Sequence, residues 1–385
     1  MRRSAVVLVL VAVFATACAQ AGEPVLVEGT VAPTATPTAT PVPPTPTPAP
    51  TATPVPTPTP TCTQALPVRQ AAAQLVVTLA TPGELGQLDE LAEAGEVSGV
   101  VVLGAPSTDQ IAAIPIADVA GVPMIIGSDE EGGRVQRLSH LLGALPAAST
   151  LAGIAVEEVT ETFKRYGTAM AQLGFTLVLA PVIDVGGGPG IGDRALSEDP
   201  QVVIEHGAAI IDGYQASGLV PVLKHFPGHG SGSADSHLGF STTPPLSELR
   251  ERDLLPYEAL LSDDLVVLVG HLLVPGLDED TPASLSVKAI AELLRQELGF
   301  DGVVMTDSLG MNAVSDRWTN EEAATLAVAA GVDLVLVDAP GQVVPVVDAL
   351  VAAHDSGQIS RDRIDESLDR VLALKGIDPC AIGLG

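Results

Sequence analysis

The densest group of chemically active side chains lies between Lys224 and His237. Lys224, His225 and His229 belong to one Lys-His-Phe-Pro-Gly-His-Gly run, and Asp235 and His237 follow on a Gly/Ser-rich stretch. Residues two apart in an extended segment project to the same side, so the Asp235 carboxylate can hold one tautomer of the His237 imidazole. An imidazole oriented by a carboxylate is a general acid/base unit. The spacing therefore predicts that His237 transfers protons and that Asp235 orients its imidazole.

A further reactive carboxylate is Asp307, which directly follows an apolar run at 302–305 and Thr306. A carboxylate that emerges from a dry strand into a polar mouth is a candidate nucleophile. Asp is also common as the N-cap of a following helix, where its side chain accepts backbone N–H bonds. From this segment alone, both interpretations of Asp307 stay open.

Metal-assisted hydrolysis is an alternative use of the histidines. His225, His271 and Asp338 each follow an apolar run, as ligands do in metal-dependent barrel hydrolases. Those enzymes also need a His-x-His at the end of the first strand, where this chain has Thr-Leu-Ala at 78–80. The sequence therefore disfavours a metal site, and a third interpretation is that the histidines only cap loops.

The segments that carry these residues alternate regularly along the chain. Continuous Val, Ile and Leu runs are typical of parallel strands buried on both faces, and amphipathic stretches between them indicate helices. Eight such strands over about 310 residues predict a (β/α)₈ barrel, with a doubly wound open sheet as the alternative. The runs are 75–79, 97–103, 122–126, 175–185, 219–223, 265–269, 302–305 and 332–337, and the helical stretches are 84–94, 151–173, 202–216, 246–261, 287–298 and 321–330.

Barrel enzymes place active residues just past the carboxyl ends of the strands. The ionisable residues of this chain gather at those points: at 129–134, at 184 and 192–194, at 224–230, and at His271, Asp307 and Asp338. Polar groups collected at one rim of an apolar barrel predict a site for a small polar substrate.

The first 62 residues predict export and a spacer. Residues 1–17 combine Arg2 and Arg3, an apolar run from Ala5 to Phe14 and a small-residue cleavage site, which is the pattern of a signal peptide. Cys18 follows as in a bacterial lipobox, so we expect its lipidation, with ordinary cleavage as the alternative. Residues 18–62 are rich in Pro, Thr and Ala and predict a disordered, extended linker. Residues 63–385 form the predicted catalytic barrel.

Cys62 and Cys380 bracket this predicted barrel. In an oxidising compartment, two cysteines at the two ends of a domain predict a disulfide that ties those ends together. We therefore expect a Cys62–Cys380 bridge.

The expected location of the protein is the cell envelope, where it is lipid-anchored to the outer face of the cytoplasmic membrane or else secreted.

Acidic residues outnumber basic ones 47 to 18, which gives a formal net charge of −29. Such a field repels nucleic acid and anionic lipid. A nucleic-acid partner is therefore not expected, and membrane contact is expected only through the N-terminal anchor. The composition leaves the oligomeric state open, and a monomer is favoured.

Five motifs in fixed order give the chain a family resemblance. Together they resemble the NagZ-type β-N-acetylglucosaminidases of glycoside hydrolase family 3, over residues 68–375. The resemblance implies a single-domain barrel enzyme that acts on a small carbohydrate and needs no metal or organic cofactor. The motifs are Asp-Glu-Glu-Gly-Gly-Arg-Val-Gln-Arg at 129–137, Ile-Gly-Asp-Arg at 191–194, Lys-His-Phe-Pro-Gly-His-Gly at 224–230, Asp-Ser-His at 235–237 and Thr-Asp-Ser-Leu-Gly-Met at 306–311.

The resemblance also implies roles for individual residues. Asp307 matches the nucleophile, and His237 matches the acid/base, with Asp235 as its partner. Glu130 stands where Gln is usual, and we expect it to add negative charge near the site. The residues that match sugar-binding groups are Asp129, Arg137, Arg194, Lys224 and His225.

The function implied is that of a retaining exo-β-N-acetylhexosaminidase that acts on cell-wall fragments or related glycans. A neutral histidine repels phosphate less than a glutamate would, so a phosphorylase is one alternative. A glycan-binding lipoprotein without catalysis is another, and the intact set of Asp307, Asp235 and His237 argues against it. A β-glucosidase specificity is disfavoured by the histidine acid/base.

Overall fold

The computed structural model describes residues 66–378 and 380. The predicted signal peptide at 1–17, the lipidation site Cys18, the linker at 18–62 and Cys62 lie outside these residues. They stay predictions, and so does the Cys62–Cys380 bridge. Among the helices of the described residues, none has both the length and the apolar character of a membrane span.

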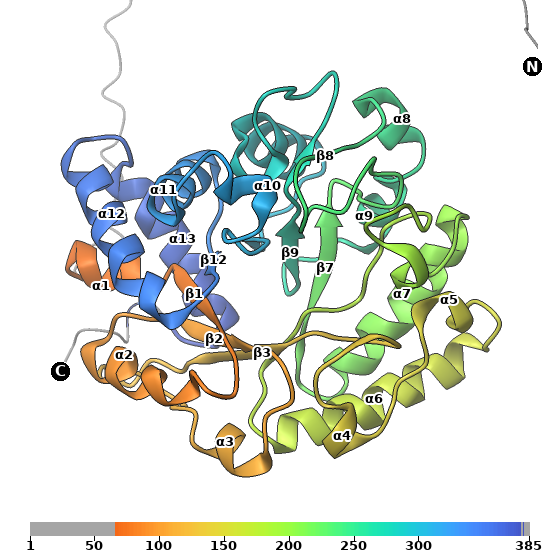
Figure 1. The fold of residues 1–385 in the computed structure, drawn as a ribbon, viewed down its shortest axis with the longest axis horizontal. Coiled ribbons are helices and arrows are strands. Elements are labelled where there is room, and N and C mark those ends of the chain that lie inside the picture. The colour runs from red at the N-terminus through yellow and green to blue at the C-terminus, as the bar shows by residue number, and fades with distance from the viewer. Residues whose placement is uncertain (1–65, 379, 381–385) are drawn as a thin grey trace, which may run out of the picture. The chain divides into compact units, whose positions relative to one another are not determined.

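Eight parallel strands form a barrel (Figure 1). They pair in the order β11-β9-β7-β6-β3-β2-β1-β12, and the two outer members of this order meet through a bridge between Met305 and Leu334. This closure confirms the predicted (β/α)₈ barrel and rules out the open sheet. The strands are β1 (Val76–Ala80), β2 (Gly99–Val102), β3 (Ile125–Ser128), β6 (Leu177–Val178), β7 (Val220–Phe226), β9 (Val266–Val269), β11 (Val303–Thr306) and β12 (Val335–Val337).

Each predicted apolar run overlaps one of these strands, because side chains buried on both faces of a parallel sheet must be apolar. The fourth strand is much shorter than its run. Only β6 is regular there, and pairing with β7 resumes at a single bridge between Val182 and Lys224. Pro181 interrupts the ladder because it has no N–H to donate.

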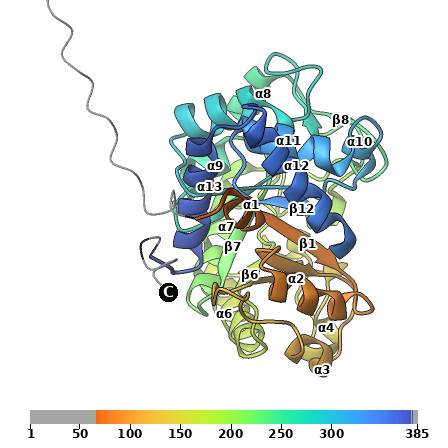
Figure 2. The same ribbon diagram turned by 90° about the vertical axis from the view of Figure 1, so that its left-hand side faces the viewer.

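Helices cover the outside of the barrel (Figures 1 and 2). The first of them, α1, packs beside α12 and α13, so the two ends of the described chain meet on one side of the barrel. Local sequence sets some of their boundaries: Thr319 and Glu322 form a capping box at the start of α11. The main helices are α1 (Val68–Ala73), α2 (Leu88–Ala94), α3 (Thr108–Ala112), α6 (Val156–Gln172), α7 (Pro200–Gln215), the π-helix η5 (Lys288–Glu297), α11 (Asn320–Ala330), α12 (Val343–Asp355) and α13 (Arg361–Leu374).

One predicted helix is divided in two. The stretch 246–261 forms α8 (Leu246–Glu251) and α9 (Leu255–Leu260), so the prediction of one continuous helix is wrong. Pro256 lies in the first turn of α9, where its missing N–H has no intrahelical partner to lose. In the middle of a longer helix the same proline would remove a hydrogen bond and clash with the preceding turn.

A buried carboxylate holds the closing strands together at the end of the barrel opposite the strands' carboxyl ends. Asp333, just before β12, is fully buried and pairs with Arg295 of η5 at 2.5 Å and Arg363 of α13 at 2.7 Å. Its Oδ2 also accepts the backbone N–H of Val304 in β11 at 2.9 Å. One side chain thus joins the last two strands to two outer helices.

Candidate active site

A cavity of about 570 Å³ lies at the carboxyl ends of the strands. Every strand, or the residue just after it, contributes to its lining, and the apolar part includes five leucines: Leu79, Leu103, Leu179, Leu268 and Leu336. The structure brings together all but one of the predicted site residues here. Those that line the cavity are Asp129, Arg137, Arg194, Lys224, His225, His237 and Asp307. Asp235 is not in the lining and contacts the cavity through His237.

Two carboxylates that follow β3 face two basic side chains. Lys224 Nζ lies 2.7 Å from Asp129 Oδ1 and 2.6 Å from Glu131 Oε1, and Arg194 donates to both Glu131 oxygens at 2.7 and 2.8 Å. Burial alone would raise the pKa of Glu131, but Lys224 and Arg194 hold it at about 2. Burial would also raise the pKa of Asp129, but the nearby Lys224 ammonium keeps that pKa below its usual value. These charged, directional groups are suited to bind sugar hydroxyls.

Glu131 and Asp184 are site residues that the sequence analysis did not assign. Glu131 lies two residues after Asp129 in the first motif, and this spacing was the available signal. Asp184 is buried and lies 2.7 Å from His225 Nδ1, while Arg194 Nη2 lies 3.2 Å from His225 Nε2. Because arginine only donates, Nε2 must accept and Nδ1 must carry the proton. Asp184 therefore fixes the tautomer and the position of the His225 imidazole.

Asp307 stands directly after β11, with its backbone N–H bonded to Val269 O at 3.0 Å. Burial would raise the pKa of its carboxyl, but the neighbouring His271 and His225 and the Ser308 N–H keep it below its usual value. The next helix, α10 (Asn312–Ser315), begins five residues later with Met311 at its cap, so Asp307 does not cap that helix. The geometry therefore favours the nucleophile interpretation: an ionised carboxylate at the cavity wall.

His237 lies on the loop that joins β7 to β8 (Ser241–Thr242). Its Nδ1 is 2.7 Å from Asp235 Oδ1, which also accepts the His237 backbone N–H at 3.0 Å. Burial would raise the pKa of Asp235, but these two bonds lower it, so the carboxylate stays ionised. With Nδ1 held in this way, Nε2 is the nitrogen that can exchange a proton with a molecule in the cavity.

Glu130 does not face the cavity. It is completely buried and absent from the cavity lining, so the charge that the sequence analysis expected near the site lies behind the lining and not in it. Its carboxylate accepts four hydrogen bonds on the other side of the β4 (Glu130–Gly132) and β5 (Val135–Gln136) hairpin. The donors are the Ser128 hydroxyl at 2.9 Å, the Arg137 and Leu138 backbone N–H groups at 3.0 Å, and the Tyr166 hydroxyl at 2.7 Å. Glu130 thus positions the backbone of a predicted sugar-binding residue.

The Glu130→Gln variant should change how stability depends on pH. Burial raises the pKa of Glu130 from 4.5 to about 7. A carboxyl with a raised pKa binds its proton more tightly in the folded protein than in the unfolded chain. Its contribution to stability is therefore fully present below pH 4.5 and is lost as the pH rises through about 7. The loss lowers the free energy of unfolding by about 3 kcal/mol, and it should be absent from the Gln variant because Gln does not titrate.

Urea unfolding of the two proteins at about pH 5 and about pH 8 measures this difference. Wild type should lose more stability than Glu130→Gln between the two pH values. The exposed Glu158→Gln on α6 is the matched control and should behave as wild type. An equal pH dependence in wild type and Glu130→Gln would show that Glu130 has an ordinary pKa.

The alternative metal site finds little support in the placement of His271. Its Nδ1 lies 2.7 Å from Ser284 Oγ and its Nε2 lies 2.8 Å from Ser308 O, so both ring nitrogens are engaged. Within residues 66–378 and 380, no group of three or more His, Cys, Asp and Glu side chains is arranged to hold a metal ion. His271 instead supports the loop that carries Asp307.

Comparison with known proteins adds a family and several relatives. Residues 104–374 match the model described as the glycosyl hydrolase family 3 N terminal domain. The chain is 43% identical over 276 residues to the β-hexosaminidase LpqI of Mycobacterium tuberculosis, covering 69% of this chain and 71% of that protein. It is 37% identical over 243 residues to a β-hexosaminidase of Stenotrophomonas maltophilia, covering 60% and 72% of the two chains.

Solved structures agree with this match. A glycosyl hydrolase of family 3 from Mycobacterium smegmatis superposes with a TM-score of 0.75 at 37% identity, over 82% of this chain and 98% of that one. A family 3 β-N-acetylglucosaminidase from Paenibacillus also has a TM-score of 0.75, at 34% identity, over 83% of this chain and 64% of that one. Both superpositions extend over more than four fifths of this chain.

Proposed function

The chain belongs to glycosyl hydrolase family 3 and is a glycoside hydrolase of O-glycosyl bonds, and on this premise we propose a retaining exo-β-N-acetylhexosaminidase. The observation that carries the proposal is the cavity shared by Asp307 and His237. Retention requires a nucleophile and a separate acid/base at the scissile bond. A carboxylate after β11 and an Asp-oriented imidazole after β7 supply these two groups.

The reaction proceeds in two displacements. In the first, Asp307 attacks the anomeric carbon, the bond from that carbon to the leaving oxygen breaks, and protonated His237 gives its Nε2 proton to that oxygen. The leaving group departs as an alcohol, and the sugar is held as an ester of Asp307. In the second, His237 takes a proton from water, the water oxygen attacks the anomeric carbon, and Asp307 is released as a carboxylate. Asp235 holds the ring through Nδ1 in both steps.

The remaining polar residues bind the sugar and support its developing charge. Lys224, Arg194, Arg137, Asp129 and His225 offer donors and acceptors from several strand ends, which fixes the ring relative to Asp307. The transition state has oxocarbenium character, and a carboxylate at a site shielded from water stabilises such positive charge more than it does in bulk solvent. The five leucines of the lining supply this shielding.

The N-acetylglucosamine specificity is supported by the relatives. The M. tuberculosis and S. maltophilia proteins carry the name β-hexosaminidase, and the Paenibacillus structure is that of a β-N-acetylglucosaminidase. As part of the same proposal, the substrate is a terminal β-linked N-acetylglucosamine on a cell-wall fragment or related glycan. The protein acts as a monomer in the cell envelope, anchored through lipidated Cys18 and tied by a Cys62–Cys380 bridge.

The test is release of nitrophenol by the full chain. Nitrophenyl β-N-acetylglucosaminide and nitrophenyl β-glucoside are compared side by side, each with and without inorganic phosphate. We expect a clear preference for the acetamido sugar and no acceleration by phosphate. Acceleration by phosphate would replace hydrolysis with phosphorolysis. Release from neither substrate by folded protein would leave a glycan-binding protein as the better interpretation.

A further inference from the structure

His229 belongs to the Lys-His-Phe-Pro-Gly-His-Gly run, but the catalytic steps do not use it. It is buried and absent from the lining of the catalytic cavity. Its backbone N–H donates to Asp184 Oδ1 at 2.6 Å, and the same carboxylate holds the His225 imidazole. The two imidazoles pack edge to face, with their ring centroids 5.9 Å apart. His229 is thus fixed directly behind the residues that line the cavity.

Two glycines pack closely against the His229 ring. A Cβ at Gly190 would lie 2.5 Å from the Cε1 atom of the ring, and a Cβ at Gly232 would lie 2.9 Å from its Nδ1. Both distances are too short for a real contact, so the backbone approaches the imidazole at these two positions only because they lack a side chain. This close packing leaves the ring little freedom to turn.

The His229 ring contacts the loop that carries the acid/base. Its Nε2 lies 3.2 Å from Ser236 Oγ, and both side chains are buried. Burial lowers the pKa of His229 below its usual value, so the ring is neutral at neutral pH and carries one proton. Nδ1 has no hydrogen-bond partner among the described residues. The proton is therefore better placed on Nε2, where it is donated to the Ser236 hydroxyl.

Ser236 is the buried point of an otherwise accessible loop. It is 4% exposed, whereas the other residues from Ser233 to Phe240 are partly or fully exposed. It lies between Asp235 and His237, and the His237 side chain is 63% exposed. A hydrogen bond to Ser236 therefore acts on the two neighbours that form the proton-transfer pair.

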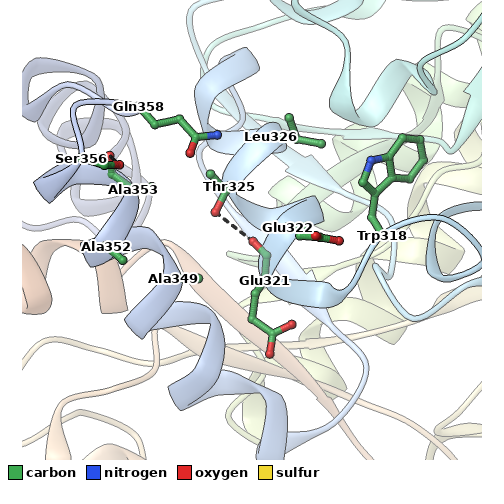
Figure 3. A pocket seen from close by; sticks show the side chains of 10 residues that line it. All are labelled: Trp318, Glu321, Glu322, Thr325, Leu326, Ala349, Ala352, Ala353, Ser356 and Gln358. Atoms are coloured by element: carbon green, nitrogen blue, oxygen red, sulfur yellow. Dashed lines mark hydrogen bonds between the residues drawn. The ribbon is translucent and has the colours of Figure 1, made fainter.

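A second support of the same loop lies outside the barrel. Ala313 N–H of α10 donates to Ser236 O at 3.4 Å, and the exposed Arg317 guanidinium stacks over the Phe240 ring at 4.2 Å. Next to Arg317, Trp318 lies at one end of a cavity of about 620 Å³ between α11 and α12 (Figure 3). This outer support is exposed and borders empty space. The buried hydrogen bond from the imidazole is the firmer of the two supports.

From these contacts we propose that His229 is a positioning residue for the acid/base. Its Nε2–H holds the Ser236 hydroxyl, and this contact places the loop so that the His237 ring faces the leaving oxygen. The inference rests on the proposed function and deepens it, because it adds a residue that acts on proton transfer without touching the sugar. It also gives a role to the second histidine of the motif, which neither sugar binding nor the nucleophile requires.

The first experiment compares kcat/KM of the full chain for two substrates. Di-N-acetylchitobiose needs a proton on its leaving oxygen, and nitrophenyl β-N-acetylglucosaminide does not. In Ser236→Ala, the ratio of the first value to the second should fall about tenfold, as expected when loss of a hydrogen bond displaces a catalytic group. Ser247→Ala removes an exposed serine of α8 and should leave the ratio unchanged. An equal loss on both substrates, or no loss on either, would overturn the proposal.

Two replacements test His229 itself. Glutamine can place its side-chain amide near the position of Nε2 and keep a donor for Ser236, so the ratio in His229→Gln should stay close to that of wild type. Leucine has a similar size but no donor, so the ratio in His229→Leu should fall as it does in Ser236→Ala. A ratio in folded His229→Gln that is as low as in His229→Leu would show that the hydrogen bond does not position the loop.

A double variant shows whether the effect passes through the acid/base. In the His237→Ala background, Ser236→Ala should cause no further loss of kcat/KM for di-N-acetylchitobiose, because the group that Ser236 positions is already absent. A further loss as large as the one in the wild-type background would mean that Ser236 acts independently of His237, and would overturn the proposal.

Hydrogen exchange separates this proposal from the proposed reaction, since it needs no turnover. Backbone amides of residues 233–240 should exchange faster in Ser236→Ala and His229→Leu than in wild type, and Ser247→Ala should exchange as wild type does. If the wild-type chain hydrolysed neither substrate, the proposed function would fail, while faster exchange in the two variants would still support His229 as the residue that holds the loop. Unchanged exchange in both variants would overturn the proposal, whatever the rates show.

Discussion

Asp307→Ala is expected to abolish turnover of nitrophenyl β-N-acetylglucosaminide, with a loss of at least about 10⁴-fold in kcat. The reason is that alanine offers no oxygen to form the glycosyl ester, while binding groups such as Lys224 and Arg194 stay in place. Steady-state release of nitrophenol measures the loss. Mass spectrometry of wild-type protein quenched during turnover should also detect one N-acetylglucosaminyl group on the peptide that contains Asp307.

The control for this variant lies at the opposite end of the same strand. Asp301 precedes β11, and its exposed carboxylate pairs with Arg370 at 2.6 Å. Exposed ion pairs contribute little to stability, so Asp301→Ala should fold and turn over like wild type. Substantial activity in Asp307→Ala, or a sugar adduct on another residue, would remove Asp307 from the role of nucleophile.

His237→Ala is expected to separate substrates by their leaving groups. A positioned general acid contributes about 10²–10⁴-fold when the leaving oxygen is a poor leaving group, as it is in an oligosaccharide. Nitrophenolate departs without a proton, so formation of the glycosyl-enzyme should suffer much less with the aryl glycoside. Pre-steady-state and steady-state rates on nitrophenyl β-N-acetylglucosaminide and on di-N-acetylchitobiose give the two losses.

The neighbouring Leu238→Ala serves as the loop control. Leu238 is 79% exposed, and its replacement removes no group that transfers protons. Asp235→Asn keeps the shape of the partner but removes its charge, and should show a weaker form of the His237→Ala pattern. If His237→Ala slowed glycosyl-enzyme formation equally on both substrates, the proton donor would have to be sought elsewhere in the cavity.

Much of the fold was predictable because its signals are local. A strand buried on both faces must be a continuous apolar run, and eight such runs separated by amphipathic stretches leave few arrangements besides a barrel. The same reasoning places Lys224, His225 and Asp307 at one rim, since parallel strands present their carboxyl ends together. Because these signals are local, they also led to the wrong prediction of one helix over 246–261. The apolar periodicity continues through this stretch, but the chain forms two helices, and Pro256 lies in the first turn of the second.

The directions of the consecutive acidic residues after β3 were not predictable. Asp129 and Glu131 line the cavity and Glu130 does not. The Glu130 carboxylate instead accepts hydrogen bonds from Ser128 at the end of β3, from the two backbone N–H groups that follow β5, and from the Tyr166 hydroxyl of α6. The family resemblance identified Glu130 as a residue that stands where Gln is usual. It could not show that Glu130 is buried, because that burial depends on α6, which begins more than twenty residues later.

Composition and local periodicity were enough to identify the reactive side chains, their order, and the strand ends to which they belong. Their pairing became visible only in the folded chain: Lys224 lies between Asp129 and Glu131, Arg194 pairs with Glu131, and Asp184 holds His225. These contacts link segments far apart in the chain, and they form because β3, β6 and β7 lie side by side in the barrel.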